Sequence, residues 1–279
     1  MRAWVGDRDG GAVLDAGEAR VSVLDHGFTV ADGVFETLKV TSDGPFALTR
    51  HLRRLAASAA ALGLVEPVDA VVRTAVAEVL AANAALLGDL GRLRITYTGG
   101  AAPLGSDRGD ARPTLVVAVA PATPWPATTT VATVPWTRNE RSAVAGVKST
   151  SYAENVVALQ RAHAAGASEA VLANTRGELC EGTGTNVLVV MDGRVLTPPL
   201  SSGCLAGITR ELAIEWFGVA EASLPLEVLY SADEVMLTSS TRNVHPVVAV
   251  DARRWDAAGP VARDLQAAFD ERAAQHVDP

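Results

Sequence analysis

Lysine is almost absent from this chain of 279 residues, and the surroundings of one lysine suggest covalent chemistry. Of 24 basic residues only Lys39 and Lys148 are lysine, and the rest are arginine. A neutral lysine amine can attack a carbonyl carbon, whereas a guanidinium stays protonated. Lys148 stands among uncharged residues just before an expected helix, where partial desolvation disfavours the charged amine. Lys148 is therefore a candidate Schiff-base lysine; the alternative is a solvated lysine near a helix end.

A lone carboxylate, Glu181, stands in a glycine-rich stretch downstream of this lysine. The neighbouring Gly182 and Gly184 allow another group to approach the backbone closely. They do not form a dinucleotide-binding fingerprint, because Val187 occupies the place of the third glycine. Glu181 is a candidate for pairing with a cationic ring, and an ordinary glycine-rich turn is the alternative.

Two further segments offer hydrogen-bond donors to an anion. Ile208 and Thr209 follow Gly207 at an expected helix start, where unpaired backbone N–H groups and the helix dipole favour a phosphate. Ser240 and Thr241 follow an apolar strand. A lysine, a single carboxylate, a helix start and hydroxyls at a strand end are together the groups that would hold pyridoxal phosphate. A simple helix cap and a polar loop are the alternatives.

The residues from 34 to 40 are expected to form a strand, because apolar and polar residues alternate there. The alternation places Phe35, Thr37 and Lys39 on one face of that strand. Further helices are predicted at 49–62, 68–87, 152–165, 207–218 and from residue 260. Further strands are predicted at 92–98, 114–120, 129–134, 169–173, 186–191, 194–197 and 233–238. Ser151 and Glu154 form a capping-box pattern at the start of the third helix.

The proline-rich stretch at residues 121–126 cannot sustain a helix or a central strand. We therefore expect an α/β (α+β) fold of two lobes. The predicted division is an N-terminal α/β lobe at residues 1–120, a linker at 121–127 and a C-terminal cofactor-binding lobe at 128–279.

Composition excludes several classes of protein. Hydrophobic residues make up 48% of the chain, too many for a disordered protein. A net charge of −8 and a pI of 5.2 argue against nucleic acid and anionic membranes as partners. No apolar run is expected to be long enough to span a membrane and the first residues do not resemble a signal peptide, so a cytoplasmic location is expected. Two cysteines and scattered histidines argue against a disulfide framework and a metal site.

Several motifs occur in an order that resembles the class IV, fold-type IV family of pyridoxal-phosphate enzymes. They are Asp32-Gly-Val-Phe-Glu-Thr37, His51-Leu-Arg-Arg-Leu55, Lys148, Glu181-Gly-Thr-Gly-Thr-Asn186, Leu196-Thr-Pro-Pro199, Leu205-Ala-Gly-Ile-Thr-Arg210 and Asp233-Glu-Val with Thr238-Ser-Ser-Thr241. The family contains branched-chain and D-amino acid aminotransferases, (R)-amine transaminases and aminodeoxychorismate lyases. The resemblance covers nearly the whole chain.

The resemblance implies a role for each candidate. Lys148 would bond the cofactor and move the proton, and Glu181 would pair with the pyridine nitrogen. Arg54 would reach the phosphate, although the helical pattern alone does not separate it from Arg50 or Arg53. Contacts to the phosphate would also come from Ile208, Thr209, Ser240 and Thr241, and the substrate pocket would be lined by Phe35, Thr37 and Lys39. A homodimer with the active site between the lobes and near the partner subunit is also implied.

No subfamily pattern is complete. The stretch from Thr98 to Ala102 lacks the arginine and histidine with which the best-known D-amino acid aminotransferases bind the substrate carboxylate. The tyrosine that branched-chain enzymes carry five residues after the lysine is replaced by Ala153. Lys39 and Arg242 are the remaining candidates for binding that carboxylate, and an ion pair is the alternative for Arg242.

The expected function is transamination between a small D-amino acid or (R)-amine and a 2-oxo acid such as pyruvate or 2-oxoglutarate. An aminodeoxychorismate lyase is the first alternative, and a branched-chain L-amino acid aminotransferase is the next. A non-catalytic cofactor-binding protein is disfavoured by the presence of both Lys148 and Glu181.

Overall fold

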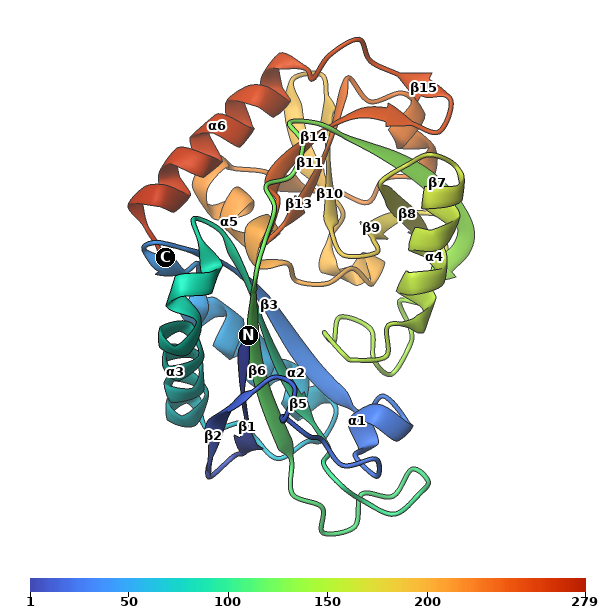
Figure 1. The fold of residues 1–279 in the computed structure, drawn as a ribbon. Coiled ribbons are helices and arrows are strands. Elements are labelled where there is room, and N and C mark those ends of the chain that lie inside the picture. The colour runs from blue at the N-terminus through green and yellow to red at the C-terminus, as the bar shows by residue number, and fades with distance from the viewer. The chain divides into compact units, whose positions relative to one another are not determined.

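The computed structural model describes residues 1–279 and divides into two compact units (Figure 1). Unit 1 comprises Met1–Pro124, Val147–Ser151 and Val277–Pro279. Unit 2 comprises Trp125–Gly146 and Tyr152–His276. The expected division into 1–120, 121–127 and 128–279 thus differs from these units at one important place. The segment that carries Lys148 groups with unit 1, although it follows the proline-rich stretch in the sequence.

Unit 1 is built on a six-stranded antiparallel sheet in the order β2-β1-β6-β5-β3-β4. Its strands are β1 (Arg2–Asp7), β2 (Gly10–Asp15), β3 (Gly33–Thr41), β4 (Gly44–Pro45), β5 (Gly91–Thr98) and β6 (Thr114–Pro121). Its helices are α1 (His26–Thr29), α2 (Leu48–Ala61) and α3 (Asp69–Leu87). Antiparallel neighbours alternate their side chains between the two faces, so one face can be apolar and the other polar.

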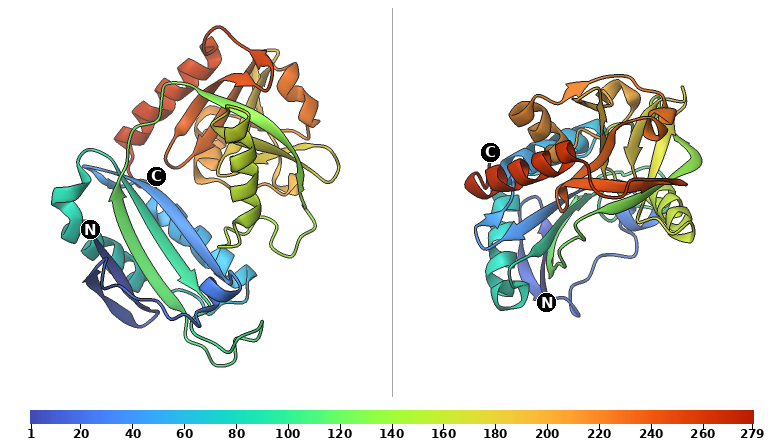
Figure 2. Two further views of the ribbon diagram at one scale, coloured as in Figure 1. Left: turned by 45° about the vertical axis from the view of Figure 1, so that its right-hand side comes forward. Right: turned by 90° about the horizontal axis from the view of Figure 1, so that it is seen from above.

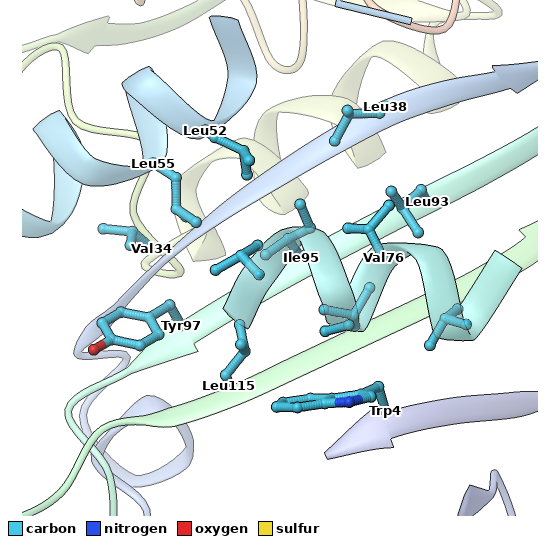
Figure 3. Packing of buried hydrophobic residues seen from close by; sticks show 14 of the residues in the cluster. Trp4, Val34, Leu38, Leu52, Leu55, Val76, Leu93, Ile95, Tyr97 and Leu115 are labelled. Atoms are coloured by element: carbon cyan, nitrogen blue, oxygen red, sulfur yellow. The ribbon is translucent and has the colours of Figure 1, made fainter. Parts of the chain in front are cut away.

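The core of unit 1 lies between one face of this sheet and the helices α2 and α3 (Figure 3). Val34 and Leu38 of β3 and Leu93, Ile95 and Tyr97 of β5 point to this face and are fully buried. Leucines of α2 and valines of α3 pack against them. The alternate residues of β3 and β5, which include Phe35 and Lys39, therefore lie on the opposite face.

Unit 2 is built on a nine-stranded mixed sheet in the order β12-β11-β10-β13-β14-β7-β8-β9, with β15 paired to β14. Figure 2 shows the ribbon from two further sides. Its strands are β7 (Thr129–Arg138), β8 (Glu169–Asn174), β9 (Leu179–Gly182), β10 (Asn186–Met191), β11 (Arg194–Thr197), β12 (Ala220–Glu221), β13 (Glu234–Ser239), β14 (Asn243–Val250) and β15 (Arg253–Arg254). Its helices are α4 (Ala153–Ala164), α5 (Ile208–Phe217) and α6 (Pro260–Gln275), with 3-10 turns at Leu200–Ser202 and Leu226–Tyr230. Helix α4 connects the parallel strands β7 and β8 and packs against both through Ala158 and Ala162.

The predicted helices and strands are confirmed, except that β7 extends four residues beyond its predicted end. Strands β1, β2, β9 and β14 lie outside the predicted ranges, and Pro246 of β14 lacks the N–H that a central strand normally donates. The capping box is wrong. Helix α4 has Tyr152 and not Ser151 at its N-cap, with no side-chain cap, and the Glu154 carboxylate accepts a hydrogen bond from Arg138 Nη1 at 2.8 Å.

Helix α3 differs from the expectation that no segment is long enough to span a membrane. By length and composition alone its 19 residues could do so. Asp69, Arg73 and Glu78 interrupt the apolar run in the sequence, but the average over the whole helix remains apolar. Its buried face packs against the sheet of unit 1. A core helix passes the same test, so this property is weak evidence for a membrane span.

Candidate active site

Lys148 lies on a segment that pairs with the free edge of β3. The Phe35 N–H donates to the Lys148 carbonyl at 3.0 Å, and the Thr150 N–H donates to the Gly33 carbonyl at 2.8 Å. The Thr150 hydroxyl also donates to the Ala31 carbonyl at 2.8 Å. These bonds hold the backbone of Lys148 against β3, five residues ahead of α4. A strand edge, and not a helix start, therefore positions the lysine.

The Phe35 ring contacts two cations of unit 1. Lys148 Nζ lies 4.4 Å from the ring centroid, and the guanidinium carbon of Arg94 lies 3.3 Å from the same centroid. Arg94 Nε also donates to the Thr96 hydroxyl at 3.2 Å. Cation–ring attraction favours both contacts. Arg94 was missed by the sequence analysis, although the alternation of β5 could have placed it on the face of Phe35.

The register of β3 and β5 confirms that Phe35, Thr37 and Lys39 share one face. Thr37 is paired with Arg94, and Lys39 with Arg92. Lys39 Nζ lies 5.4 Å from the Phe46 ring centroid. Because a strand rises about 3.3 Å per residue, Lys39 is roughly 13 Å along β3 from Phe35. The structure thus places Lys148, Phe35 and Arg94 together and Lys39 farther along the same face.

Arg54 belongs to a buried polar cluster on the other face of β3. Its Nε and Nη2 donate to the two carboxylate oxygens of Glu36 at 2.8 and 2.6 Å, and His51 Nδ1 lies 2.6 Å from Glu36 Oε2. Of the alternatives from the sequence, Arg50 donates to the Pro279 carbonyl at 2.9 Å and Arg53 is exposed. Arg54 is therefore the arginine of α2 whose guanidinium is fixed by a buried partner.

Charge controls protonation in this cluster. Burial raises the pKa of the Glu36 carboxyl, but Arg54 and His51 outweigh burial and lower this pKa to about 2. Burial is also the main reason why the pKa of His51 is lowered, although Glu36 acts in the opposite direction. Arg54, whose guanidinium stays protonated, therefore supplies the lasting positive charge that keeps Glu36 ionised.

Glu181 is held at β9 in unit 2 by one backbone donor and one cation. The Leu205 N–H donates to Glu181 Oε2 at 2.9 Å, and Arg138 Nε lies 3.1 Å from Oε1. The side chains of Glu181 and Arg138 are largely buried. Both partners favour the ionised carboxylate. Arg138 has no signal in the sequence, because only the fold brings the end of β7 to β9.

Helix α5 begins beside Glu181 through a chain of local contacts. The Asn186 side-chain amide donates to the Leu205 carbonyl at 2.8 Å. A Cβ on Gly207, the N-cap of α5, would lie 1.9 Å from Asn186 Oδ1, so this close approach requires glycine. Asn186 is paired with Thr238 of β13, and the turn with Ser240 and Thr241 follows. Glu181, the start of α5 and this turn therefore lie at one end of the sheet of unit 2.

The hydrogen bonding of the Thr209 side chain indicates whether an anion fits the start of α5. Its hydroxyl is buried and makes no hydrogen bond within the protein. A buried hydroxyl without a partner costs free energy, which a phosphate oxygen at the helix start would recover. The unpaired hydroxyl in the first turn of the helix and the glycine N-cap thus fit a phosphate group.

Thr209→Val is expected to weaken phosphate binding and to stabilise the protein without cofactor. A hydrogen bond to a charged group contributes about 1.5–3 kcal/mol, so the dissociation constant of the cofactor should rise about 10- to 150-fold. The cofactor-free variant should unfold at a higher temperature, because it no longer buries an unpaired hydroxyl. Thr197→Val is the matched control: Thr197 Oγ1 donates to the Val187 carbonyl at 2.9 Å, so its loss should lower stability and leave cofactor binding unchanged. An unchanged dissociation constant in Thr209→Val would contradict the phosphate assignment.

Arg242 takes part in a network of unit 2. Its Nη2 lies 3.5 Å from Glu169 Oε2, and its guanidinium carbon lies 3.8 Å from the Trp125 ring centroid. His245 Nδ1 lies 3.4 Å from Nη1. The side chain is 6% exposed. These contacts agree with the ion-pair alternative that the sequence left open.

Residues 33–250 match the model of the amino-transferase class IV family. A putative branched-chain-amino-acid aminotransferase from Methanocaldococcus jannaschii is 34% identical over 87% of each chain. A D-alanine aminotransferase from Staphylococcus haemolyticus is 31% identical over 94% of this chain and 95% of its own.

Among solved structures, a fold IV transaminase from Curtobacterium pusillum superposes with a TM-score of 0.85. The two chains are 30% identical, and the match covers 98% of this chain and 99% of the other. The expected fold class is thereby confirmed.

Proposed function

The chain belongs to the class IV aminotransferases, and we propose that it exchanges an amino group between a small D-amino acid or (R)-amine and a 2-oxo acid such as pyruvate or 2-oxoglutarate. Enzymes of this family depend on pyridoxal phosphate, which supplies a reactive aldehyde and a ring that accepts electrons. The observation that carries the proposal is a lysine amine fixed on a strand edge and in contact with an aromatic ring.

Lys148 is proposed to bond the cofactor aldehyde through Nζ and to move the proton at the substrate carbon. Its backbone is fixed on β3 and Nζ lies against Phe35, so the amine has little freedom to leave the reacting position. Glu181 is proposed to hold a proton on the pyridine nitrogen. The Leu205 N–H and Arg138 keep this carboxylate ionised, and an ionised carboxylate favours the protonated ring.

The phosphate is proposed to bind Ile208 and Thr209 at the start of α5, Ser240 and Thr241 in the turn after β13, and Arg54. The unpaired hydroxyl of Thr209 supports this assignment directly. Phe35, Thr37, Lys39 and Arg242 remain the proposed substrate-contacting residues, with Arg242 least favoured because Glu169 and Trp125 already contact its guanidinium. The proposal includes a cytoplasmic homodimer.

The D or (R) configuration is supported by the D-alanine aminotransferase relative, which matches this chain over nearly its whole length. The branched-chain relative is slightly more identical over a shorter part of the chain, so a branched-chain L-amino acid aminotransferase is the second candidate.

Reactions with single amino donors, in the absence of a 2-oxo acid acceptor, distinguish these functions. The purified, cofactor-loaded enzyme is mixed with D-alanine, D-glutamate, (R)-1-phenylethylamine or L-leucine, and loss of the visible absorption of the lysine-bound cofactor is followed. Reaction with the D or (R) donors and not with L-leucine is expected. Reaction with L-leucine alone would establish the second candidate. No reaction with any donor, together with pyruvate release from aminodeoxychorismate, would establish a lyase instead.

A further inference from the structure

We infer that Arg94 binds the α-carboxylate of the substrate, so that the enzyme acts on amino acids in preference to amines without a carboxylate. The inference rests on the proposed transaminase function and assigns it a substrate class. It also assigns a role to a residue outside the motifs from which the site residues were predicted.

Distance is the first argument. The guanidinium carbon of Arg94 and Lys148 Nζ lie 3.3 and 4.4 Å from the same ring centroid, so their separation cannot exceed the sum of these two distances. In an amino acid the carboxylate carbon is one bond, about 1.5 Å, from the carbon on which Lys148 acts. A charged hydrogen bond adds about 2.8 Å. A carboxylate on the reacting carbon is therefore within reach of Arg94.

Orientation is the second argument. The guanidinium carbon lies 3.3 Å from the Phe35 ring centroid, and aromatic rings stack on the face of a guanidinium whereas a carboxylate bonds to its edge, so both interactions can exist together. The bond from Nε to the Thr96 hydroxyl fixes the rotation of the side chain. A guanidinium held in this way loses little conformational entropy when it binds a carboxylate.

The other candidate cations are less suitable for an α-carboxylate. Lys39 is roughly 13 Å along β3 from Phe35 and lies near Phe46. Arg92 is paired with Lys39 and is exposed. Arg242 of unit 2 contacts Glu169 and Trp125. Lys39 is better placed for a second, distal carboxylate than for the one on the reacting carbon.

Arg94→Leu tests this inference with donors that differ only in the carboxylate. Both enantiomers of phenylglycine are compared with both enantiomers of 1-phenylethylamine, in which a methyl group replaces the carboxylate, and alanine is added as a small donor. Loss of one partner of a desolvated charge pair costs about 2–5 kcal/mol, so kcat/KM for the reactive amino acid should fall about 30- to 4,000-fold. The rate with 1-phenylethylamine should stay the same or rise. Arg94→Lys should recover part of the lost rate.

Arg92→Leu is the matched control, because it removes a cation from the same strand and face without touching Phe35. It should leave the alanine rate within about threefold of the wild type. Calorimetric titration of the loaded enzyme with propanoate gives a readout apart from turnover, and only the Arg94 variants should lose this binding. Arg94→Gln, with circular dichroism and the melting temperature, separates loss of binding from loss of folding.

Equal losses for phenylglycine and 1-phenylethylamine in Arg94→Leu would overturn the inference, as would unchanged rates with both donors. A wild-type enzyme that prefers 1-phenylethylamine to every amino acid would also overturn it while leaving the transaminase function intact. A wild-type enzyme that reacts with no donor would instead defeat the proposed function.

Discussion

Lys148→Ala is expected to lower turnover by at least about 10⁴-fold and to remove the visible absorption of the lysine-bound cofactor. Proton transfer by a positioned side chain alone contributes up to about 10⁴-fold, and the covalent bond is lost as well. The backbone of residue 148 is held by the bonds to Phe35 and β3, so the truncation should leave the fold unchanged. Absorption spectroscopy and single-turnover rates measure the two effects.

Lys39→Ala is the control that the chain itself offers, since Lys39 is the only other lysine. It should keep the visible absorption and alter only the range or affinity of substrates. Lys148→Arg should be as inactive as Lys148→Ala, because a guanidinium cannot replace the amine. If Lys39→Ala loses the absorption while Lys148→Ala keeps it, the assignment of the reactive lysine is wrong.

Glu36→Gln is expected to destabilise the protein by about 3–5 kcal/mol at neutral pH. The substitution removes the carboxylate that pairs with the guanidinium of Arg54, whose side chain is 11% exposed. Breaking a buried ion pair from one side has this cost because the remaining charge stays desolvated. Urea unfolding at about pH 7 measures the loss. Glu18→Gln, which removes an exposed carboxylate of unit 1, should change stability by less than about 0.5 kcal/mol.

The stability that Glu36 contributes depends on pH with a definite sign. The pKa of Glu36 falls from 4.5 to about 2 on folding, so its contribution, about 3 kcal/mol, is complete above pH 4.5 and is lost as the pH falls toward 2. The pKa of His51 is also lowered on folding, so the contribution of His51 to stability decreases as the pH falls below 6.5. The wild type should therefore lose more stability than Glu36→Gln as the pH falls below 4.5.

A wild type and a variant whose stabilities decline in parallel below pH 4.5 would contradict this account of Glu36. The double variant Glu36→Gln, Arg54→Met supplies a second check. It should recover part of the stability, because it also removes the desolvated charge whose carboxylate partner is lost in Glu36→Gln.

The two-unit α/β fold was largely predictable, because the spacing of hydrophobic residues and the positions of turn residues are local properties of the sequence. Alternation identified β3 and β5, and Gly207 and Gly218 marked the ends of α5. The capping box failed because Arg138, distant in sequence, binds Glu154. The assignment of residues 147–151 to the C-terminal lobe was also wrong, because their pairing with β3 depends on the tertiary fold and leaves no local pattern in the sequence.

The sequence by itself determined which residue types can do the chemistry. Only two lysines exist, and residue type and local surroundings made Lys148, Glu181 and the start of α5 candidates. Alternation alone placed Phe35, Thr37 and Lys39 on one face. These results are possible because amine reactivity, helix starts and strand faces depend on residue type and close neighbours in sequence.

Only the tertiary structure decided which groups act on one another. It placed Arg94 against Phe35 and Lys148, bound Arg54 to Glu36, and paired Arg138 with Glu181. It also showed that Thr209 has a buried hydroxyl without a partner. Each of these facts depends on distances between segments far apart in sequence, where burial and neighbouring charge set the strength of an interaction.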